Sequence, residues 1–334
     1  MRILAFIDLV QDIEVMAPLL LGGLADRHRG WSLDLIVSRS LRASAPDALA
    51  RLKATGLAFR LVVRREVIAG RSPDLRGVGA VITASESSHP AHAAGHALAR
   101  RANAAGLATY TLQHGLENVG LEDRAESIAS RRIFTWFPPA RAAAMPAEVR
   151  SRLVHVGRPH PPAPGAEPRC QVGVFENLHA ERYGAGHREA FVAGLDALAG
   201  AGVRALLRPH PAGGWSRDID LGRWPTVTLA GAGTIQEAIV ACARVITTPS
   251  TVALDAAQAG RPVALAGDGG ELYGPLPVLR EPDDWPAFAL ASDDQSPALT
   301  AFLERVVQPG DAVVKILDRL RQDLMNGLAS QQKV

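Results

Sequence analysis

An α/β protein of two domains is predicted from three features of the sequence. Short apolar runs of strand length alternate with helix-length amphipathic segments along most of the chain. Several of these runs are apolar throughout, which is typical of parallel strands buried on both faces of a sheet. The alternation is interrupted by residues 158–170, which include five prolines and show no periodicity. The predicted fold class is therefore two Rossmann-like domains that face each other across a cleft.

Residues 1–157 are predicted to form the first domain. The apolar residues of its first helix follow helical spacing: Ile13, Met16, Leu20, Leu21 and Leu24. The predicted helices are 12–28, 46–55, 89–103 and a short helix within 139–152. The predicted strands are 3–9, 33–37, 58–63, 79–84, 107–113, 131–137 and 153–157.

The Pro-rich segment 158–170 is predicted to be a hinge, and residues 171–310 to be a second domain of the same kind. The predicted strands of this domain are 171–177, 203–209, 226–229, 245–248 and 262–267. Its predicted helices are 186–200, 234–243 and one that begins at 252. Residues 311–334 contain an amphipathic helix, 311–330, which we expect to pack back across the hinge.

The composition is that of a soluble globular protein. Of the 334 residues, 47% are hydrophobic and 21% are charged. The net charge of +2 is too small to indicate binding to nucleic acid. Arginine-containing runs at 27–29 and 64–65 are compatible with an anionic membrane surface or an acidic substrate, and solvated faces explain them equally simply.

The cysteine content and the N-terminus predict a cytoplasmic protein. Cys170 and Cys242 are the only cysteines and lack metal-like spacing, so we expect them to be reduced. Asp8 interrupts the N-terminal apolar run, which therefore does not resemble the core of a signal peptide. The stretch 15–25 is too short to span a bilayer. Peripheral association with the inner membrane and the oligomeric state are left open.

The clearest functional signal lies at two strand ends of the second domain, within LLRPHP at 206–211 and TTPSTVALDAAQAGRPVAL at 247–265. Ligands of open α/β sheets bind outside the carboxyl ends of the strands, where helix N-termini offer unpaired N–H groups. An N-cap and a simple turn would also account for these residues, but their order favours a phosphate-bearing ligand. The predicted phosphate-binding residues are Arg208, His210, Pro211, Ser250 and Thr251, with Asn177 and His179 from the loop after 171–177.

These motifs resemble bacterial enzymes that build capsules and teichoic acids, within the GT-B class of glycosyltransferases. The His-Pro pair at His210, the Ser/Thr turn and Asp255 are similar to motifs of CDP-glycerol glycerophosphotransferases, polysialyltransferases and capsular Kdo transferases. LQHGLEN at 112–118 resembles the His-Gly element of the same groups. The chain departs from the polymerases in having Pro-Ser-Thr where they have two adjacent serines.

The resemblance implies an inverting, metal-independent transferase with no cofactor, because the nucleotide-activated sugar is a substrate and CMP or CDP a product. The donor would be linked to CMP or CDP. The acceptor would be a capsule or lipopolysaccharide glycan, free or lipid-linked. His114 would take the proton from the acceptor hydroxyl, and Glu117 and Asp123 would either orient its imidazole or serve as the base themselves.

Further residues near the predicted cleft have weaker assignments. Ordinary loop and helix-surface roles are the alternative for each of them. The predicted acceptor-side residues are Asp8, Gln11, Asp12 and Gly115. The residues predicted to contact the ribose or base are Gly231, Gly233, Glu237 and Asp255.

A metal site is not expected. His92 and His96, near His89, have a spacing that can chelate a metal, but no cysteine or second motif accompanies them. A polar helix face near the cleft is the preferred interpretation. No DxD-type pair of carboxylates stands at a strand end, which also favours metal-free transfer.

Three other functions remain open from the sequence. A CDP-glycerol-type polyol phosphate transferase would share the same motifs. A UDP-sugar 2-epimerase would share the two-domain architecture, although those enzymes prefer an acidic pair where this chain has Leu254-Asp255. A degenerate domain pair acting as a binding subunit would need neither His114 nor His210.

Overall fold

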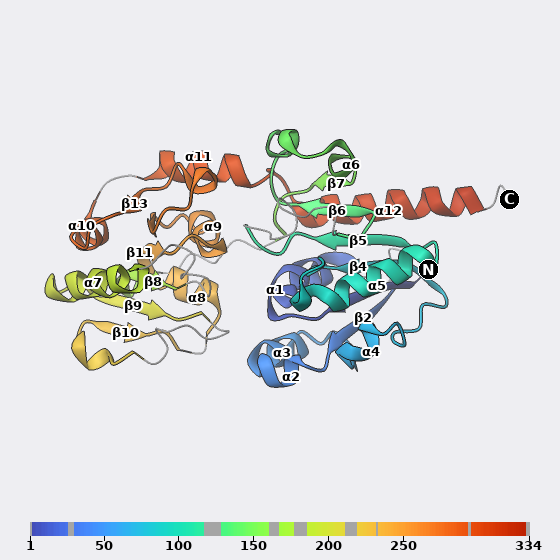
Figure 1. Ribbon diagram of the computed structural model, residues 1–334, viewed down its shortest axis with the longest axis horizontal. Helices are drawn as coiled ribbons and strands as arrows, with labels where there is room; N and C mark the ends of the chain where they lie inside the picture. The colour runs from blue at the N-terminus through green and yellow to red at the C-terminus, as the bar shows by residue number, and fades with distance from the viewer. Residues whose placement is uncertain are drawn as a thin grey trace. The chain divides into compact units, whose positions relative to one another are not determined.

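A computed structural model describes residues 2–25, 30–116, 128–159, 167–176, 186–210, 219–231, 233–292 and 295–331. The chain divides into two compact units. Unit 1 comprises Met1–Pro161 and Val307–Val334, and unit 2 comprises Pro162–Val306. Each unit contains one parallel sheet with helices between its strands, so the predicted class of two Rossmann-like domains is confirmed (Figure 1).

Unit 1 is built on a seven-stranded sheet in the order β3-β2-β1-β4-β5-β6-β7. All neighbouring strands are parallel. The chain runs outward from β1 toward β3, then returns to β4 on the other side of β1. The topological switch point therefore lies between β1 and β4. The strands are β1 (Arg2–Ile7), β2 (Ser32–Ser38), β3 (Arg60–Val62), β4 (Val78–Thr83), β5 (Ala108–Leu112), β6 (Arg132–Thr135) and β7 (Leu153–His155).

The helices of unit 1 bury their apolar sides against this sheet and against each other. Helix α5 packs on β4, β5 and α4, whereas α1 packs on β1, α3 and α12. The C-terminal helix α12 also contacts η1, where an added Cβ at Gly22 would lie 2.8 Å from Val313 Cγ1. The helical segments are α1 (Val10–Leu19), η1 (Leu20–Leu24), α2 (Leu41–Ser44), α3 (Pro46–Ala54), α4 (Arg64–Ile68), η3 (Pro90–His92), α5 (Ala93–Ala104), η5 (Pro139–Ala144), α6 (Ala147–Arg150) and α12 (Ala312–Gln331).

Unit 2 is built on a six-stranded parallel sheet in the order β10-β9-β8-β11-β12-β13. Its switch point lies between β8 and β11. The strands are β8 (Cys170–Phe175), β9 (Ala205–Arg208), β10 (Val227–Leu229), β11 (Cys242–Thr247), β12 (Val263–Ala266) and β13 (Val278–Leu279). The helical segments are α7 (His187–Gly200), η8 (Leu221–Arg223), α8 (Ile235–Val240), α9 (Thr251–Gln258), η9 (Glu271–Tyr273), α10 (Asp284–Leu290) and α11 (Ser296–Val306).

The core of unit 2 depends on the close packing of α7 and α10 (Figure 1). Phe191 and Trp285 are buried and meet edge to face at 5.4 Å between ring centroids. Gly194 makes this contact possible, because an added Cβ would lie 2.2 Å from the Trp285 ring. The contact between these two aromatic side chains thus holds α10, a helix that the sequence did not predict, against α7.

The sequence prediction differs from the structure in several places, and it does not include the short helices α2 and α4. The helix predicted over 12–28 changes at Leu20 into a π-helical turn, consistent with Pro18, which lacks an N–H group for the helix ladder. The helix predicted over 234–243 ends at Val240, because Cys242 already pairs with Cys170 in the sheet. Between 268 and 310 the sequence suggested no elements, yet this region contains η9, β13, α10 and α11.

In the described part of the chain, no helix combines the length and the apolar character needed to cross a bilayer.

Candidate functional site

The switch point of unit 1 is held together by a buried carboxylate. Asp12, in the first turn of α1, is 1% exposed. Its Oδ2 accepts hydrogen bonds from the backbone N–H groups of Asp8 (2.8 Å) and Leu9 (2.9 Å), and its Oδ1 accepts one from the Ser85 hydroxyl. Burial raises the pKa of Asp12 to about 6. Asp12 therefore joins the end of β1 to the loop after β4, while its predicted acceptor role stays a prediction.

A second buried carboxylate, Asp8, lies beside it at the end of β1. Asp8 is 2% exposed and pairs with Arg64 at 2.9 Å between Oδ2 and Nε. The same guanidinium donates from Nη2 to the carbonyls of Pro90 and Ala91, each at 2.9 Å. Burial raises the pKa of Asp8, and Arg64 opposes that rise. Arg64 thus ties the loop after β4 to β1, and the sequence analysis did not identify it.

The rings of His89, His92 and His114 lie in contact, one after another, beyond the carboxyl ends of β4 and β5. The His92 ring meets the His114 ring edge-on at 5.0 Å between centroids, and the His89 ring lies 5.4 Å from that of His92. The Ser87 hydroxyl lies 2.7 Å from His92 Nδ1. Gly95 lets α5 approach this loop, because an added Cβ would lie 2.4 Å from the Ser85 carbonyl oxygen.

His114 is held in one orientation by the backbone. Its Nδ1 lies 3.2 Å from the Ala84 carbonyl oxygen, which can only accept, so Nδ1–H is the donor. The neutral ring then presents Nε2 as its proton acceptor. Burial lowers the pKa of His114 to about 4. Burial, reinforced by the charges of neighbouring groups, lowers that of His92 to about 4 as well.

We expect His92 and His114 to stay neutral down to about pH 4, because protonation would place charge in a poorly solvated loop. Proton NMR of the imidazole Cε1–H signals measures this directly. In the urea-unfolded chain the same residues should titrate near pH 6.5. Native midpoints near 6.5 would contradict the burial argument.

The segment after β5 is braced by Gln113. This buried side chain donates from Nε2 to the Gly115 carbonyl at 2.8 Å and accepts from the Trp136 N–H at 2.7 Å. The two bonds orient the chain on either side of His114. Gly115, predicted on the acceptor side, is therefore placed by a neighbour that the sequence analysis did not single out.

Glu86 is another residue that sequence reasoning missed. It is 3% exposed and accepts from the Thr83 hydroxyl at 2.9 Å and from the Ser130 N–H at 2.6 Å. Burial raises its pKa. The signal in the sequence is the polar run that directly follows the apolar residues of β4. In the structure three residues of this run are buried: Ser85, Glu86 and Ser87.

Several predicted residues cannot be placed at this site. The described ranges omit 117–127, 160–166, 177–185 and 211–218, so the predictions made for five residues lie outside them: Glu117, Asp123, Asn177, His179 and Pro211. Gln11 lies in the first turn of α1 and is partly exposed. No group of three or more metal-ligating side chains suited to a metal ion occurs within the described ranges.

In unit 2, the turn between β11 and α9 lies at the switch point. The Ser250 hydroxyl accepts from the Val252 N–H at 3.2 Å, which confirms that Ser250 caps the helix. Thr251 is already the first residue of α9. The Thr247 hydroxyl donates to the Thr248 carbonyl at 2.8 Å and lies 3.2 Å from Ser250 Oγ. The hydroxyl-rich turn is compact and precedes a helix N-terminus that favours anions.

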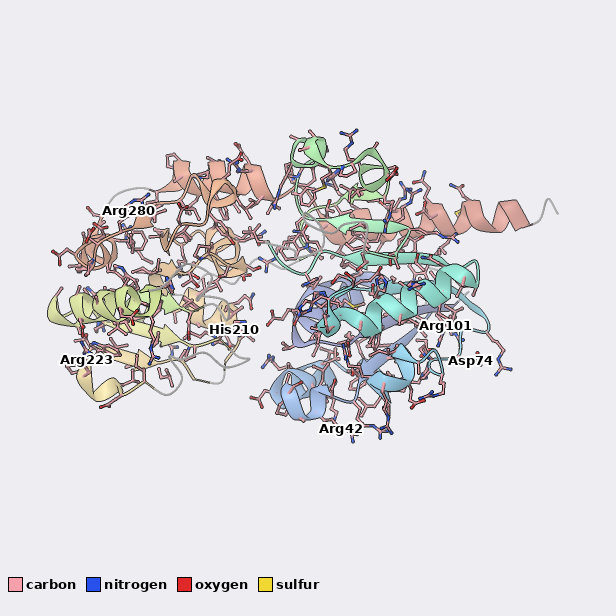
Figure 2. All side chains as sticks on the ribbon, in the orientation of Figure 1. Arg42, Asp74, Arg101, His210, Arg223 and Arg280 are labelled. Atoms are coloured by element: carbon pink, nitrogen blue, oxygen red, sulfur yellow. The ribbon has the colours of Figure 1, made fainter. Side chains whose placement is uncertain are left out.

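Strand β9, which is separated from β11 by β8, ends at Arg208, one of the predicted phosphate-binding residues. Arg208 donates from Nη2 to the Gly233 carbonyl at 2.7 Å, and its own carbonyl accepts from the Glu176 N–H at 3.2 Å. His210 follows two residues later and is partly exposed at the carboxyl end of β9 (Figure 2). Arg208 thus links the ends of β9 and β8 to the segment before α8.

Glu237, one of the predicted ribose-binding residues, is engaged in a helix cap, and Gly233, another, lies directly before that cap. Thr234 and Glu237 form a capping box: the Thr234 N–H donates to Glu237 Oε2 at 2.7 Å, and the Glu237 N–H donates to Thr234 Oγ1 at 3.1 Å. A Cβ at Gly233 would lie 2.5 Å from Glu237 Oε2, whereas one at Gly231 would meet nothing within 4 Å. The cap alone explains Gly233 and Glu237, so their contact with a nucleotide stays a prediction.

Asp255 lies within α9, the fourth residue after Thr251. It is 9% exposed, and its Oδ1 accepts from Gln236 Nε2 at 3.3 Å. This bond joins α9 to α8 behind the turn. Little of Asp255 is exposed to solvent, and its predicted contact with the ribose or base stays a prediction.

A cavity of ≈ 350 Å³ opens elsewhere at the carboxyl edge of unit 2, where β12 and β13 end and α7 begins. Its size is in the range of small-molecule sites. Arg280, labelled in Figure 2, lies directly after β13 at its rim. The lining includes Gly186, His187, Phe191, Asp268, Arg280 and Trp285. The sequence did not predict this cavity, because it forms only where the predicted helix 186–200 meets residues of the region 268–310, in which no elements were predicted.

No family model and no curated protein matches the sequence. Solved structures do match over nearly the whole chain. The Methanocaldococcus jannaschii UDP-GlcNAc 2-epimerase, in complex with UDP-GlcNAc and UDP, has a TM-score of 0.62 and 9% identity and covers 96% of this chain and 99% of its own. The wall teichoic acid polymerase TagF has a TM-score of 0.62 and 12% identity, covering 98% of this chain and 90% of its own.

The glycosyltransferase SnogD from Streptomyces nogalater has a TM-score of 0.58 and 17% identity, and covers 96% of this chain and 99% of its own. At these identities the likeness establishes the fold. It is the two-domain fold expected from the sequence, and proteins of different activities share it.

Proposed function

We propose that this protein is an inverting, metal-independent glycosyltransferase that uses a CMP- or CDP-linked sugar and acts on a cell-surface glycan. The observation that supports the proposal most is His114: a neutral imidazole at a strand end, with Nδ1 committed to the Ala84 carbonyl. Such a ring can accept a proton at Nε2. Structural similarity to a glycosyltransferase supports the same class.

In the proposed reaction, His114 Nε2 takes the proton of the acceptor hydroxyl as its oxygen attacks the anomeric carbon. The bond from that carbon to the donor phosphate breaks, and the nucleotide leaves with the bonding electrons. Unit 2 would bind this leaving group through the N-terminus of α9, capped by Ser250, and through the side chains of Arg208 and His210.

Two alternatives share the fold and make different products. A polyol phosphate transferase would consume CDP-glycerol and release CMP, and similarity to TagF favours it. A UDP-sugar 2-epimerase would change the sugar, and similarity to the archaeal epimerase favours it. Incubation with each donor, followed by chromatography of nucleotides and sugars, separates the three. A degenerate binding subunit would release no product from any donor, and that result would refute the proposal.

We expect CMP or CDP to raise the melting temperature more than UDP or GDP does, because a ligand that binds only the folded chain stabilises it. His210→Ala should weaken that binding by roughly 1–3 kcal/mol through loss of a charged hydrogen bond. Arg223→Ala is the matched control, because it removes a cation paired with Asp196 ahead of β10. Equal nucleotide affinity in the His210 variant and the wild type would refute the phosphate role.

Replacing Ser250 and Thr251 together by alanine should weaken nucleotide binding by more than it lowers stability. Loss of the α9 cap alone costs about 1 kcal/mol. Asp220→Ala is the control, because Asp220 caps η8 through the Gly222 N–H and lies before β10. Calorimetric titration with the nucleotide and urea unfolding measure the two effects. A double variant that unfolds early yet binds normally would show that these residues are caps only.

A further inference from the structure

The two cysteines of the chain are neighbours at the amino ends of two adjacent strands of the unit 2 sheet. Cys170 begins β8 and Cys242 begins β11, and the two are paired in the register of these parallel strands. Their sulfur atoms are 3.0 Å apart, although 72 residues separate them in the sequence. Both are present as free thiols.

The surroundings give the two thiols different reactivity. Cys170 is partly exposed, and contact with Cys242, supported by the charge of Arg204, lowers its pKa. Cys242 is fully buried, and contact with Cys170 together with burial raises its pKa. Space for the buried sulfur is provided by Gly173, where an added Cβ would lie 2.8 Å from Cys242 Sγ.

We propose that Cys170 and Cys242 are a site of reversible oxidation. Small-molecule disulfides such as oxidised glutathione are the oxidant, and the product is an intramolecular disulfide between the two cysteines. The Cys170 thiolate attacks one sulfur of the reagent, a mixed disulfide forms and the first glutathione thiolate leaves. Cys242 then attacks Cys170 Sγ, and the second glutathione leaves. Each leaving thiolate takes up one of the two protons that the cysteine thiols lose. The protein is oxidised by two electrons, and the reagent is reduced to two thiols.

The location of the pair predicts a structural effect. The cross-link would join β8 to β11, the strands that flank the unit 2 switch point. It would lie at the amino ends of these strands, whereas Thr247 and Ser250 are at the carboxyl end of β11. Closing a long loop restricts the unfolded chain, so the oxidised protein should be more resistant to heat. This inference is independent of the proposed transferase activity.

The test is equilibration of the full chain with mixtures of oxidised and reduced glutathione, followed by alkylation and peptide mapping. The expected product is a single chain with no free thiol and one cross-link between the peptides that contain Cys170 and Cys242. Its melting temperature should exceed that of the reduced protein by about 5–10 °C. Two free thiols at every glutathione ratio, or a cross-link between chains, would overturn the proposal.

Single variants test the order of the steps. Cys242→Ser should accumulate glutathione on Cys170, whereas Cys170→Ser should stay unmodified because Cys242 is buried. Neither variant should show the difference in melting temperature between oxidising and reducing conditions. If Cys242→Ser does not fold, Cys242→Ala gives the same test. Glutathione on Cys242 in folded Cys170→Ser would refute the assigned roles.

Discussion

Replacement of His114 by alanine is expected to slow sugar transfer about a hundredfold or more while leaving nucleotide affinity unchanged. The magnitude is that of losing a general base. Affinity should be spared because His114 belongs to unit 1, whereas the proposed nucleotide-binding residues belong to unit 2. Steady-state kinetics and calorimetric titration with CMP or CDP measure the two quantities separately.

A second variant distinguishes a base from a residue that only shapes the loop. The amide of His114→Asn can still donate to the Ala84 carbonyl, because its Nδ2 takes the position of His114 Nδ1, 3.2 Å from that oxygen, but it cannot take up a proton at neutral pH. This variant should be as slow as the alanine variant. Near-native turnover in either one would move the base to Glu117 or Asp123. Loss of nucleotide binding would instead show that unit 1 is not the acceptor side.

Arg64→Ala is expected to lower the free energy of unfolding by about 3 kcal/mol or more, because it leaves the Asp8 carboxylate buried without its cation. The loss should shrink as the pH falls. In the wild type, burial raises the pKa of Asp8 even though the charge of Arg64 opposes the rise. Removal of Arg64 should therefore raise the pKa of Asp8 further. Protonated Asp8 carries no charge, so the buried-charge part of the penalty disappears at low pH, and only the loss of the Arg64 bonds to the Pro90 and Ala91 carbonyls remains. Urea unfolding at several pH values measures the effect.

Two controls accompany this prediction. Arg60→Ala breaks another pair of the same length, 2.9 Å from Asp34, but its arginine is 50% exposed, so it should cost at most about 1 kcal/mol. The double variant with Asp8→Asn and Arg64→Ala should recover part of the stability, because no buried charge remains. An Arg64 effect no larger than that of Arg60, or one that is constant with pH, would contradict the buried-charge argument.

His92 shows what a spacing pattern leaves out. Its separation of four residues from His96 is compatible with metal chelation, although the sequence favours a polar helix face. In the structure His92 precedes α5 and contacts the rings of His89 and His114 instead. The partner that matters for His92 is 22 positions away, and only the pairing of β4 with β5 brings it close.

The candidate site was therefore predictable in part. His114 and Ser250 stood out because strand ends are recognisable from apolar runs followed by polar residues. Their partners were not recognisable. The Asp12–Ser85 bond spans 73 residues and the Asp8–Arg64 pair spans 56, and both depend on which strands become neighbours. Arg64 in particular stood in an arginine run that looked like a solvated surface.

The sequence by itself determined the α/β class, the division into two similar halves and most of the strands, because hydrophobic periodicity and proline act over a few residues. Two features required the tertiary structure: the position of β4 beside β1 and the pairing of Cys170 with Cys242. Both features depend on contacts between residues that are far apart in the sequence. Such contacts stabilise the chain only after it has folded, so no local sequence pattern predicts them.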